Sequence, residues 1–389
     1  MKKDTLDEKT VVAEKDLART EKRYRPDDLR LAGPLRRLGK LYYMKGRQSD
    51  AVALLSRALA IADAKGPLEP DVMSDLLNTL AVALSMGGRF LESLPAMRRS
   101  LELTESELGP RHASLAGRWN NIATVYMNIN DLDQAAAAMD RALAIAREAV
   151  PEGDPFWHKL WINMAGLCQY RKQPDAATDC LRKVVGDRQL KPDSPMRAIA
   201  LNNLGEIAVG QGRFDEAREL LQQAIDIKQR LLGYDHPDLI VNLLNLGELH
   251  ARTGDAVKAE SLFLEAIRIG EARLGPGHHM VGVACYRYGG SLFERGYVSS
   301  ARENLCRALG IVEAALGPGH PQTAEVRAKL GELCQGEGEL AEARGHYTAA
   351  LEALLACCGS ERPEVGQLRE RLAQLDAAER PGRRRAGPA

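Results

Sequence analysis

The sequence predicts an all-α protein in which about eight helix pairs stack as a solenoid. The main observation is a row of small residues that recur every 42 residues, except for one interval of 40 between Ala165 and Gly205. Two further positions, seven and twelve residues after each small residue, are also restricted in type. Equal units at a fixed period indicate a stack in which each unit packs only on its neighbours. The small residues are Gly39, Ala81, Ala123, Ala165, Gly205, Gly247, Gly289 and Gly331.

The first helix of each unit is expected to end seven residues after the small residue. Six of the eight residues there are glycine, one is Asn130 and one is Lys172. Glycine and asparagine tolerate the left-handed backbone conformation that commonly ends a helix. The glycines are Gly46, Gly88, Gly212, Gly254, Gly296 and Gly338.

The second helix of each unit is expected to cross the first closely. Twelve residues after the small residue stands alanine in seven units and Ser93 in the other, and a large residue such as Leu221 or Phe263 usually follows four positions later. Small residues let two helices approach, and the large residue fills the space between layers. Lys228, on the same helix as Leu221, is interpreted as a surface residue.

With these features the chain resembles a known family, the tetratricopeptide repeat. Trp119, Ile122, Ala123 and Tyr126 match the Trp, Leu, Gly and Tyr of that family's first helix. The resemblance covers roughly residues 30–356 and implies a right-handed superhelix. The units exceed the ordinary length of about 34 residues, and their exit loops read Leu-Gly-x-x-His. They are similar to the subclass found in kinesin light chains and nephrocystin-like proteins. Those loops lie at 108–112, 232–236, 274–278 and 316–320.

The domain organisation follows from these units. We expect a charged N-terminal tail or cap over residues 1–29 and a solenoid over 30–360. The fourth unit is two residues short and contains Pro174 and Pro192, so an irregular joint is predicted near 172–196. A capping helix is expected over 361–380, followed by a basic, disordered tail over 381–389. The N-terminal segment is too short for the long coiled coil of kinesin light chain, so motor binding is not implied.

Composition and motifs narrow the function. Lys plus Arg equals Asp plus Glu, 53 each, which gives no argument for nucleic acid or an acidic membrane. No signal peptide or membrane span is expected, and the seven cysteines are interpreted as reduced thiols of a cytoplasmic protein. The sequence has no P-loop, His-Glu-x-x-His or Gly-x-Ser-x-Gly motif, and His278-His279 and Cys357-Cys358 lack partners at metal spacing. We therefore predict no catalytic residue, no metal and no cofactor.

The candidate binding residues are asparagines on the first helices. Asparagine is a mediocre helix former, yet it recurs two or three positions before the small residue in consecutive units. In the resembled family these helices line a concave groove, where asparagine amides bind the backbone of a docked peptide. The alternative is that these amides join neighbouring helices within the stack. The predicted groove residues are Asn78, Asn120, Asn121, Asn163, Asn202, Asn203, Asn245, Arg287 and Lys329.

The favoured function is a non-enzymatic scaffold that binds a peptide or protein partner in this groove. The alternative is a ligand- or peptide-gated regulatory receptor, against which the long units and the short N-terminal segment count. The sequence leaves open the partner and the oligomeric state, including a monomer. The charge preference is also open, because cations and carboxylates both flank the asparagines. They are Arg118, Lys159, Glu206, Glu248 and Glu332.

Overall fold

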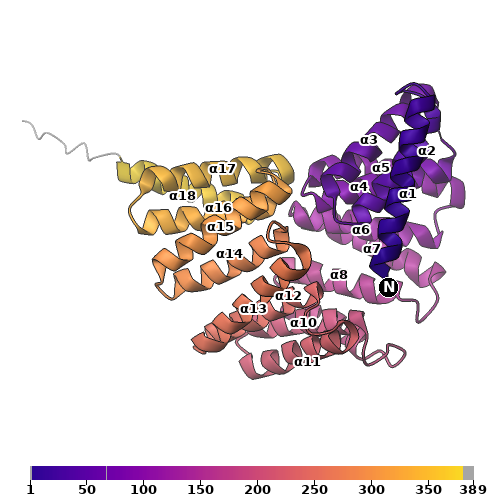
Figure 1. Ribbon diagram of the computed structural model, residues 1–389. Coiled ribbons are helices and arrows are strands. Elements are labelled where there is room, and N and C mark those ends of the chain that lie inside the picture. Colours follow the sequence, from indigo (N-terminus) through magenta and orange to yellow (C-terminus); the bar gives the residue numbers. More distant parts are fainter. Residues whose placement is uncertain (1, 67, 380–389) are drawn as a thin grey trace, which may run out of the picture. The chain divides into compact units, whose positions relative to one another are not determined.

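A computed structural model shows an all-helical protein (Figure 1). It describes residues 2–66 and 68–379, so the predicted tail with Arg383–Arg385 lies outside the described residues. In the described part there are eighteen α-helices, two 3₁₀ helices and no strand. The predicted all-α class is confirmed.

The chain divides into two compact units, residues 1–172 and 173–389. The first unit contains α1 (Lys2–Arg23), η1 (Leu29–Leu31), α2 (Ala32–Met44), α3 (Gln48–Lys65), α4 (Pro70–Met86), α5 (Phe90–Leu108), α6 (Ala113–Asn128), α7 (Leu132–Ala149) and α8 (Phe156–Tyr170). The second contains α9 (Pro174–Val185), α10 (Pro195–Gly210), α11 (Phe214–Leu232), η2 (Pro237–Leu239), α12 (Ile240–Arg252), α13 (Ala256–Leu274), α14 (His279–Glu294), α15 (Val298–Leu316), α16 (Pro321–Gly336), α17 (Leu340–Cys358) and α18 (Pro363–Glu379).

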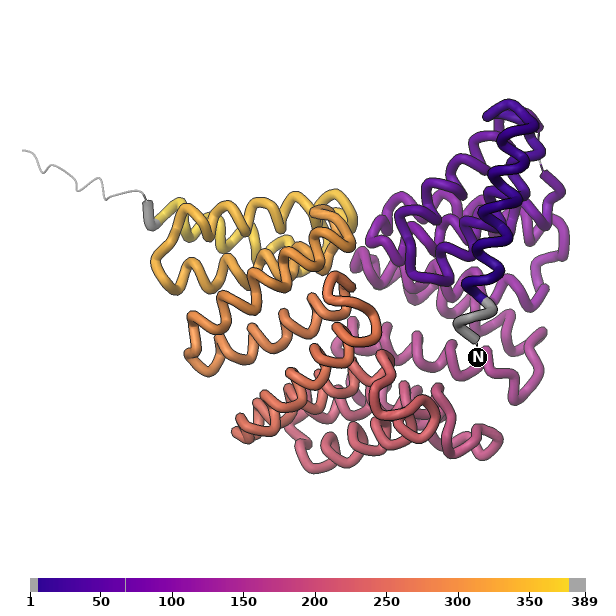
Figure 2. Tube along the Cα trace, viewed as in Figure 1, coloured from indigo at the N-terminus to yellow at the C-terminus, as the bar shows by residue number. Residues whose placement is uncertain are grey.

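Within each unit, consecutive helices pack as antiparallel pairs. The first unit holds the pairs α2/α3, α4/α5 and α6/α7, and the second holds α10/α11, α12/α13, α14/α15 and α16/α17. Figure 2 shows each first helix turning back through a short loop into its second helix. The repeat with the irregular sequence is divided, with α8 in one unit and α9 in the other. Helix α1 packs on α2, and α18 packs on α17.

The turn inside each pair has the backbone that the sequence predicts. All eight residues at this position have positive φ, from 57° at Lys172 to 84° at Gly254. Lys172 and Asn130 adopt this conformation although each carries a Cβ atom, which costs about 1–2 kcal/mol relative to a right-handed conformation. The turn thus keeps this conformation at both positions where glycine is missing.

The close crossing of the paired helices is also confirmed. A Cβ atom built on Gly205 would lie 2.7 Å from Cγ of Leu221 and 3.5 Å from the carbonyl oxygen of Ala217. Leu221 and Ala217 are fully buried. The small residue on the first helix thus makes room for the large residue on the second, as the period implies.

The exit-loop histidines cap the helices that follow. Nδ1 of His236 accepts a hydrogen bond from the backbone N–H of Asp238 at 3.2 Å, and Nδ1 of His320 accepts one from Gln322 at 3.1 Å. His112 and His278 make the same contact with Ser114 and Met280. A side-chain acceptor at this position satisfies a backbone donor left free at a helix start.

The structure corrects the interpretation of Lys228 as a surface residue, because its side chain bonds to the helix that follows. Its Nζ donates to the carbonyl oxygen of Asp238 at 2.7 Å and to Oδ1 of Asn242 at 2.6 Å. Asn242 is fully buried, and desolvation lowers the pKa of Lys228. The side chain runs from α11 onto the start of the next helix, which periodicity along α11 alone does not reveal.

We expect Lys228→Ala to lower the free energy of unfolding by about 1–2 kcal/mol, because Asn242 would lose a charged donor in a buried site. Gln223→Ala, at an exposed position of the same helix, should change it by less than about 0.5 kcal/mol. Urea unfolding followed by circular dichroism measures both. Equal midpoints for the two variants would show that the Lys228 contacts contribute nothing.

Candidate functional site

A groove runs across the first helices of the second unit. Three hollows of about 270, 370 and 590 Å³ follow one another and share lining residues. The first and second share Glu248, Arg252 and Arg287, and the second and third share Tyr286, Glu325 and Lys329. The groove thus crosses α10, α12, α14 and α16 and ends against α18.

The asparagines of this unit form a network beneath the groove. Nδ2 of Asn242 and Nδ2 of Asn245 both donate to Oδ1 of Asn202, at 3.0 and 3.2 Å. Lys228 donates to Asn242 at one end, and Arg287 donates to Oδ1 of Asn245 at 3.2 Å at the other. The network therefore joins α11, α12, α10 and α14, and it reaches the groove at Arg287.

Two of the predicted groove asparagines accordingly bond other helices of the stack. Asn202 and Asn245 are 7% and 8% exposed, and both bond across neighbouring helices. Asn203 is partly exposed, and its contact with Nδ2 of Asn202 is long, at 3.5 Å. Asn245 also lines the first hollow, whereas Asn203 lines none of the three.

In the first unit the pattern is similar. Nδ2 of Asn163 on α8 donates to Oδ1 of the buried Asn120 on α6 at 3.1 Å. Asn78 and Asn121 are partly exposed. Arg118, which flanks them, bonds Ser100 and the carbonyl oxygen of Ser74. The described contacts thus join Asn120 and Asn163 across helices, while Asn78 and Asn121 are partly exposed.

Arg287 and Lys329 both line the second hollow, but each already has a carboxylate partner. Arg287 pairs with Glu248, which also lies 3.7 Å from Nε of Arg252. Nζ of Lys329 lies 2.9 Å from Oε2 of Glu332. The groove cations are thus held in ion pairs along its floor.

Two carboxylates in the groove have no such partner. In the described part of the chain, no ion pair or hydrogen bond engages the side chains of Glu206 and Glu325. Both residues are exposed, yet desolvation by the surrounding helices raises both pKa values. Desolvation also raises the pKa of Tyr286, to about 12. These side chains are accessible to solvent, but the protein around the hollow leaves them fewer water molecules than an open surface would.

Several groove residues escaped the sequence-based prediction. Arg252 lies four residues after Glu248, and Glu325 lies four residues before Lys329, so each shares a helical face with a residue already selected. Their position one helical turn from a selected residue is the signal in the sequence that points to them. The wall formed by α18 and by Arg362 just before it depends on how that helix folds back, and no periodic signal predicts it.

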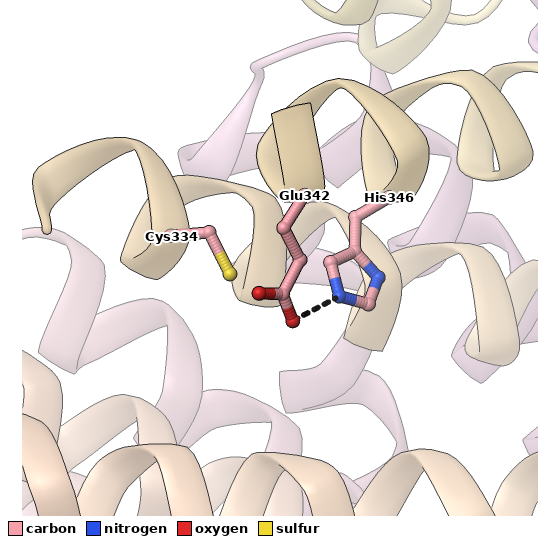
Figure 3. Close-up of side chains that lie close together, drawn as sticks. All are labelled: Cys334, Glu342 and His346. Carbon is pink, nitrogen blue, oxygen red and sulfur yellow. Dashed lines mark ion pairs between the residues drawn. The ribbon is translucent and has the colours of Figure 1, made fainter. Parts of the chain in front are cut away.

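A cluster of metal-type donors lies elsewhere in this unit. One donor atom each of Cys334 on α16 and of Glu342 and His346 on α17 lie within 4.8 Å of one another (Figure 3). Glu342 already pairs with Nε2 of His346 at 3.8 Å and with Arg302 at 3.7 Å. Burial and neighbouring carboxylates raise the pKa of the Cys334 thiol to about 11, which disfavours the thiolate that binds metals. The contacts are those of an ion-pair network around Arg302.

All seven cysteines lie in the described part of the chain and are free thiols. No helix among the described residues is long and apolar enough to cross a membrane.

Comparison with known proteins identifies the repeats. The profile of the tetratricopeptide repeat family matches residues 72–148, 158–230, 196–272 and 282–356. Among curated proteins, the chain is 24% identical over 125 residues to the protein kinesin light chain-related 3 of Arabidopsis thaliana. That match covers 32% of this chain and only 19% of the relative.

Two solved structures share the fold over most of the chain. The apo form of the quorum sensor NprR from B. thuringiensis has a TM-score of 0.55 at 12% identity, covering 91% of this chain and all of that one. The Rap conjugation gene regulator of the plasmid pLS20, solved in complex with the Phr* peptide, has a TM-score of 0.55 at 15% identity. It covers 74% of this chain, and the match spans 75% of the regulator.

Proposed function

This chain belongs to the tetratricopeptide repeat family, and from that premise we propose that it is a non-enzymatic scaffold protein. In this proposal, the groove of its second unit binds an extended peptide or an extended segment of a partner protein. The observation that carries the proposal is the continuity of the groove across α10, α12, α14 and α16. A groove that crosses successive parallel elements suits a ligand that is long and narrow.

The chemistry of the lining supports this ligand class. Amide, guanidinium and carboxylate side chains alternate with small apolar surfaces such as Ala328 and Gly290. Such groups can pair with the backbone N–H and C=O groups of an extended segment, which no regular structure satisfies internally. The related Rap regulator was solved with a peptide, which supports a peptide-binding role for this fold.

The predicted site residues take different parts in this proposal. Arg287 and Lys329 contact the ligand, and Asn245 lines the first hollow while it bonds Asn202 beneath the groove. A ligand contact for Asn203 stays a prediction. A peptide-binding role for Asn78, Asn120, Asn121 and Asn163 of the first unit stays a prediction. So do the cytoplasmic location and the absence of nucleic-acid and membrane binding. A peptide-gated regulator would use the same groove and differ in the response to binding.

Gly290→Trp tests the groove directly. Gly290 lines the second hollow, and a Cβ atom there meets nothing within 4 Å, so an indole can fill the groove without disturbing the core. Peptides of twelve residues selected from a random display library on the wild-type protein should bind the variant at least about tenfold more weakly, a loss of about 1.4 kcal/mol. Fluorescence anisotropy with the labelled peptides measures this.

Gly310→Trp on α15 is the matched control. Gly310 is exposed, its added Cβ also meets nothing within 4 Å, and it does not line the groove. Its peptide affinity should equal that of the wild type. If all three proteins bind the selected peptides equally, the binding site is not this groove.

A further inference from the structure

We propose that the groove selects a basic segment, whose Lys or Arg side chains pair with Glu206 at one end and Glu325 towards the other. The inference rests on the proposed function, and it adds the charge of the partner, which the sequence leaves open. It is carried by the pairing of the groove charges, by the space above the two carboxylates and by their spacing.

The first step is the pairing of the charges that line the first two hollows. Arg252, Arg287 and Lys329 are the cations there, and each is in an ion pair with Glu248 or Glu332. Glu206, Glu294 and Glu325 are carboxylates for which the described residues supply no ion pair. Although the groove has both signs, its unsatisfied charge is therefore negative.

The second step is the solvation of these carboxylates. Glu206 and Glu325 lie in hollows where neighbouring helices displace water, and desolvation weakens their ionised form. Coulombic attraction from Arg287 and Arg362 offsets this only in part. An incoming cation would compensate each carboxylate for the solvation that it has lost. This costs little, because no existing ion pair must break. An acidic segment would have to displace Glu248 or Glu332 from its partner first.

The third step is the shape of the places where a cation would sit. Glu206 lines the first hollow with Val209 and Gly210, and Glu325 lines the second and third hollows with Tyr286. The methylene stems of lysine and arginine can pack on such apolar surfaces while the charged ends reach the carboxylates. Tyr286 also offers a ring face to a cation.

The fourth step is the spacing. Glu206 lies on α10 and Glu325 on α16, three helices further along the groove, and α10/α12, α12/α14 and α14/α16 are in direct contact. Both carboxylates nevertheless lie close enough to Arg287, which lines the first and second hollows, for its charge to lower both pKa values. The two basic residues therefore belong to one short extended segment.

The test uses a random twelve-residue display library on the full chain and on the double variant Glu206→Gln and Glu325→Gln. Peptides selected by the wild type should be enriched in Lys and Arg. Their affinity should fall about tenfold in the double variant and should also weaken as NaCl is raised. Glu219→Gln on α11, an exposed carboxylate outside the groove, should leave it unchanged.

A stability measurement separates binding from folding. Because no described residue pairs with Glu206 or Glu325 in the free protein, the double variant should unfold at the same urea concentration as the wild type, or at a higher one. A lower midpoint would mean that the carboxylates stabilise the free fold, and it would overturn the inference.

The two proposals fail in different ways. Selected peptides that lack basic residues, or that bind the double variant as well as the wild type, overturn the basic-segment inference and leave the groove in place. If the selected peptides bind Gly290→Trp as tightly as the wild type, the groove is not the binding site. If the wild type selects no peptide at all, both proposals are wrong.

Discussion

Asn202→Ala is expected to lower the free energy of unfolding by about 2–5 kcal/mol, because two buried amide groups lose their acceptor at once. Oδ1 of Asn202 accepts from both Asn242, which is fully buried, and Asn245, which is 8% exposed. An alanine methyl accepts nothing, and the site between α10 and α12 gives water little access. Each buried donor left without a partner costs about 1–3 kcal/mol.

The adjacent Asn203→Ala is the matched control. Asn203 is partly exposed, and its one contact, with Asn202, is 3.5 Å long. It should change the free energy of unfolding by less than about 0.5 kcal/mol, as exposed positions usually do. Urea unfolding of both variants decides the matter. Equal and small losses would show that the amide network contributes little and that water replaces the missing acceptor.

Gly331→Val should destabilise the last helix pair by about 3 kcal/mol or more, because side-chain atoms would enter a filled space. A Cβ atom on Gly331 would lie 2.5 Å from Cε1 and 2.7 Å from Cδ1 of Tyr347. The tyrosine ring cannot move away easily, since it is 1% exposed and its hydroxyl donates to Gln335 at 2.9 Å. Differential scanning calorimetry should show a lower unfolding temperature for the variant.

Gly310→Val provides the comparison at an open site. Gly310 is also inside a helix, but its added Cβ meets nothing within 4 Å. Valine has a somewhat better helix propensity than glycine, so this variant should be neutral or more stable by up to about 0.5 kcal/mol. Equal destabilisation by both substitutions would mean that helix propensity, and not the contact with Tyr347, controls the effect.

The sequence by itself determined the helix pairs, their turns and their crossing. Each of these features rests on contacts inside one repeat, such as Gly205 against Leu221, so the same residue types return at every period. Between the packed helices α6 and α7, Asn130 adopts the left-handed turn without glycine. A local requirement that is repeated eight times leaves a signal in a single sequence.

Only the tertiary structure decided which asparagines bond other helices and which stay partly exposed. Asn202 and Asn203 are adjacent and equally polar, yet one is buried between two repeats and the other is partly exposed. Periodicity assigns a residue to a helical face, but a rotation of about 100° between neighbours does not say which side chain finds a partner on the next helix.

The groove charge likewise depends on tertiary contacts. The sequence shows cations and carboxylates at similar positions, and it cannot tell that Arg287 pairs with Glu248 across two helices while Glu325 pairs with none in the described part of the chain. Such pairs form between repeats, where small differences in side-chain length and helix rotation select the partner. The unsatisfied charge of a surface is therefore a property of the packed stack, because it is what remains after those pairs have formed.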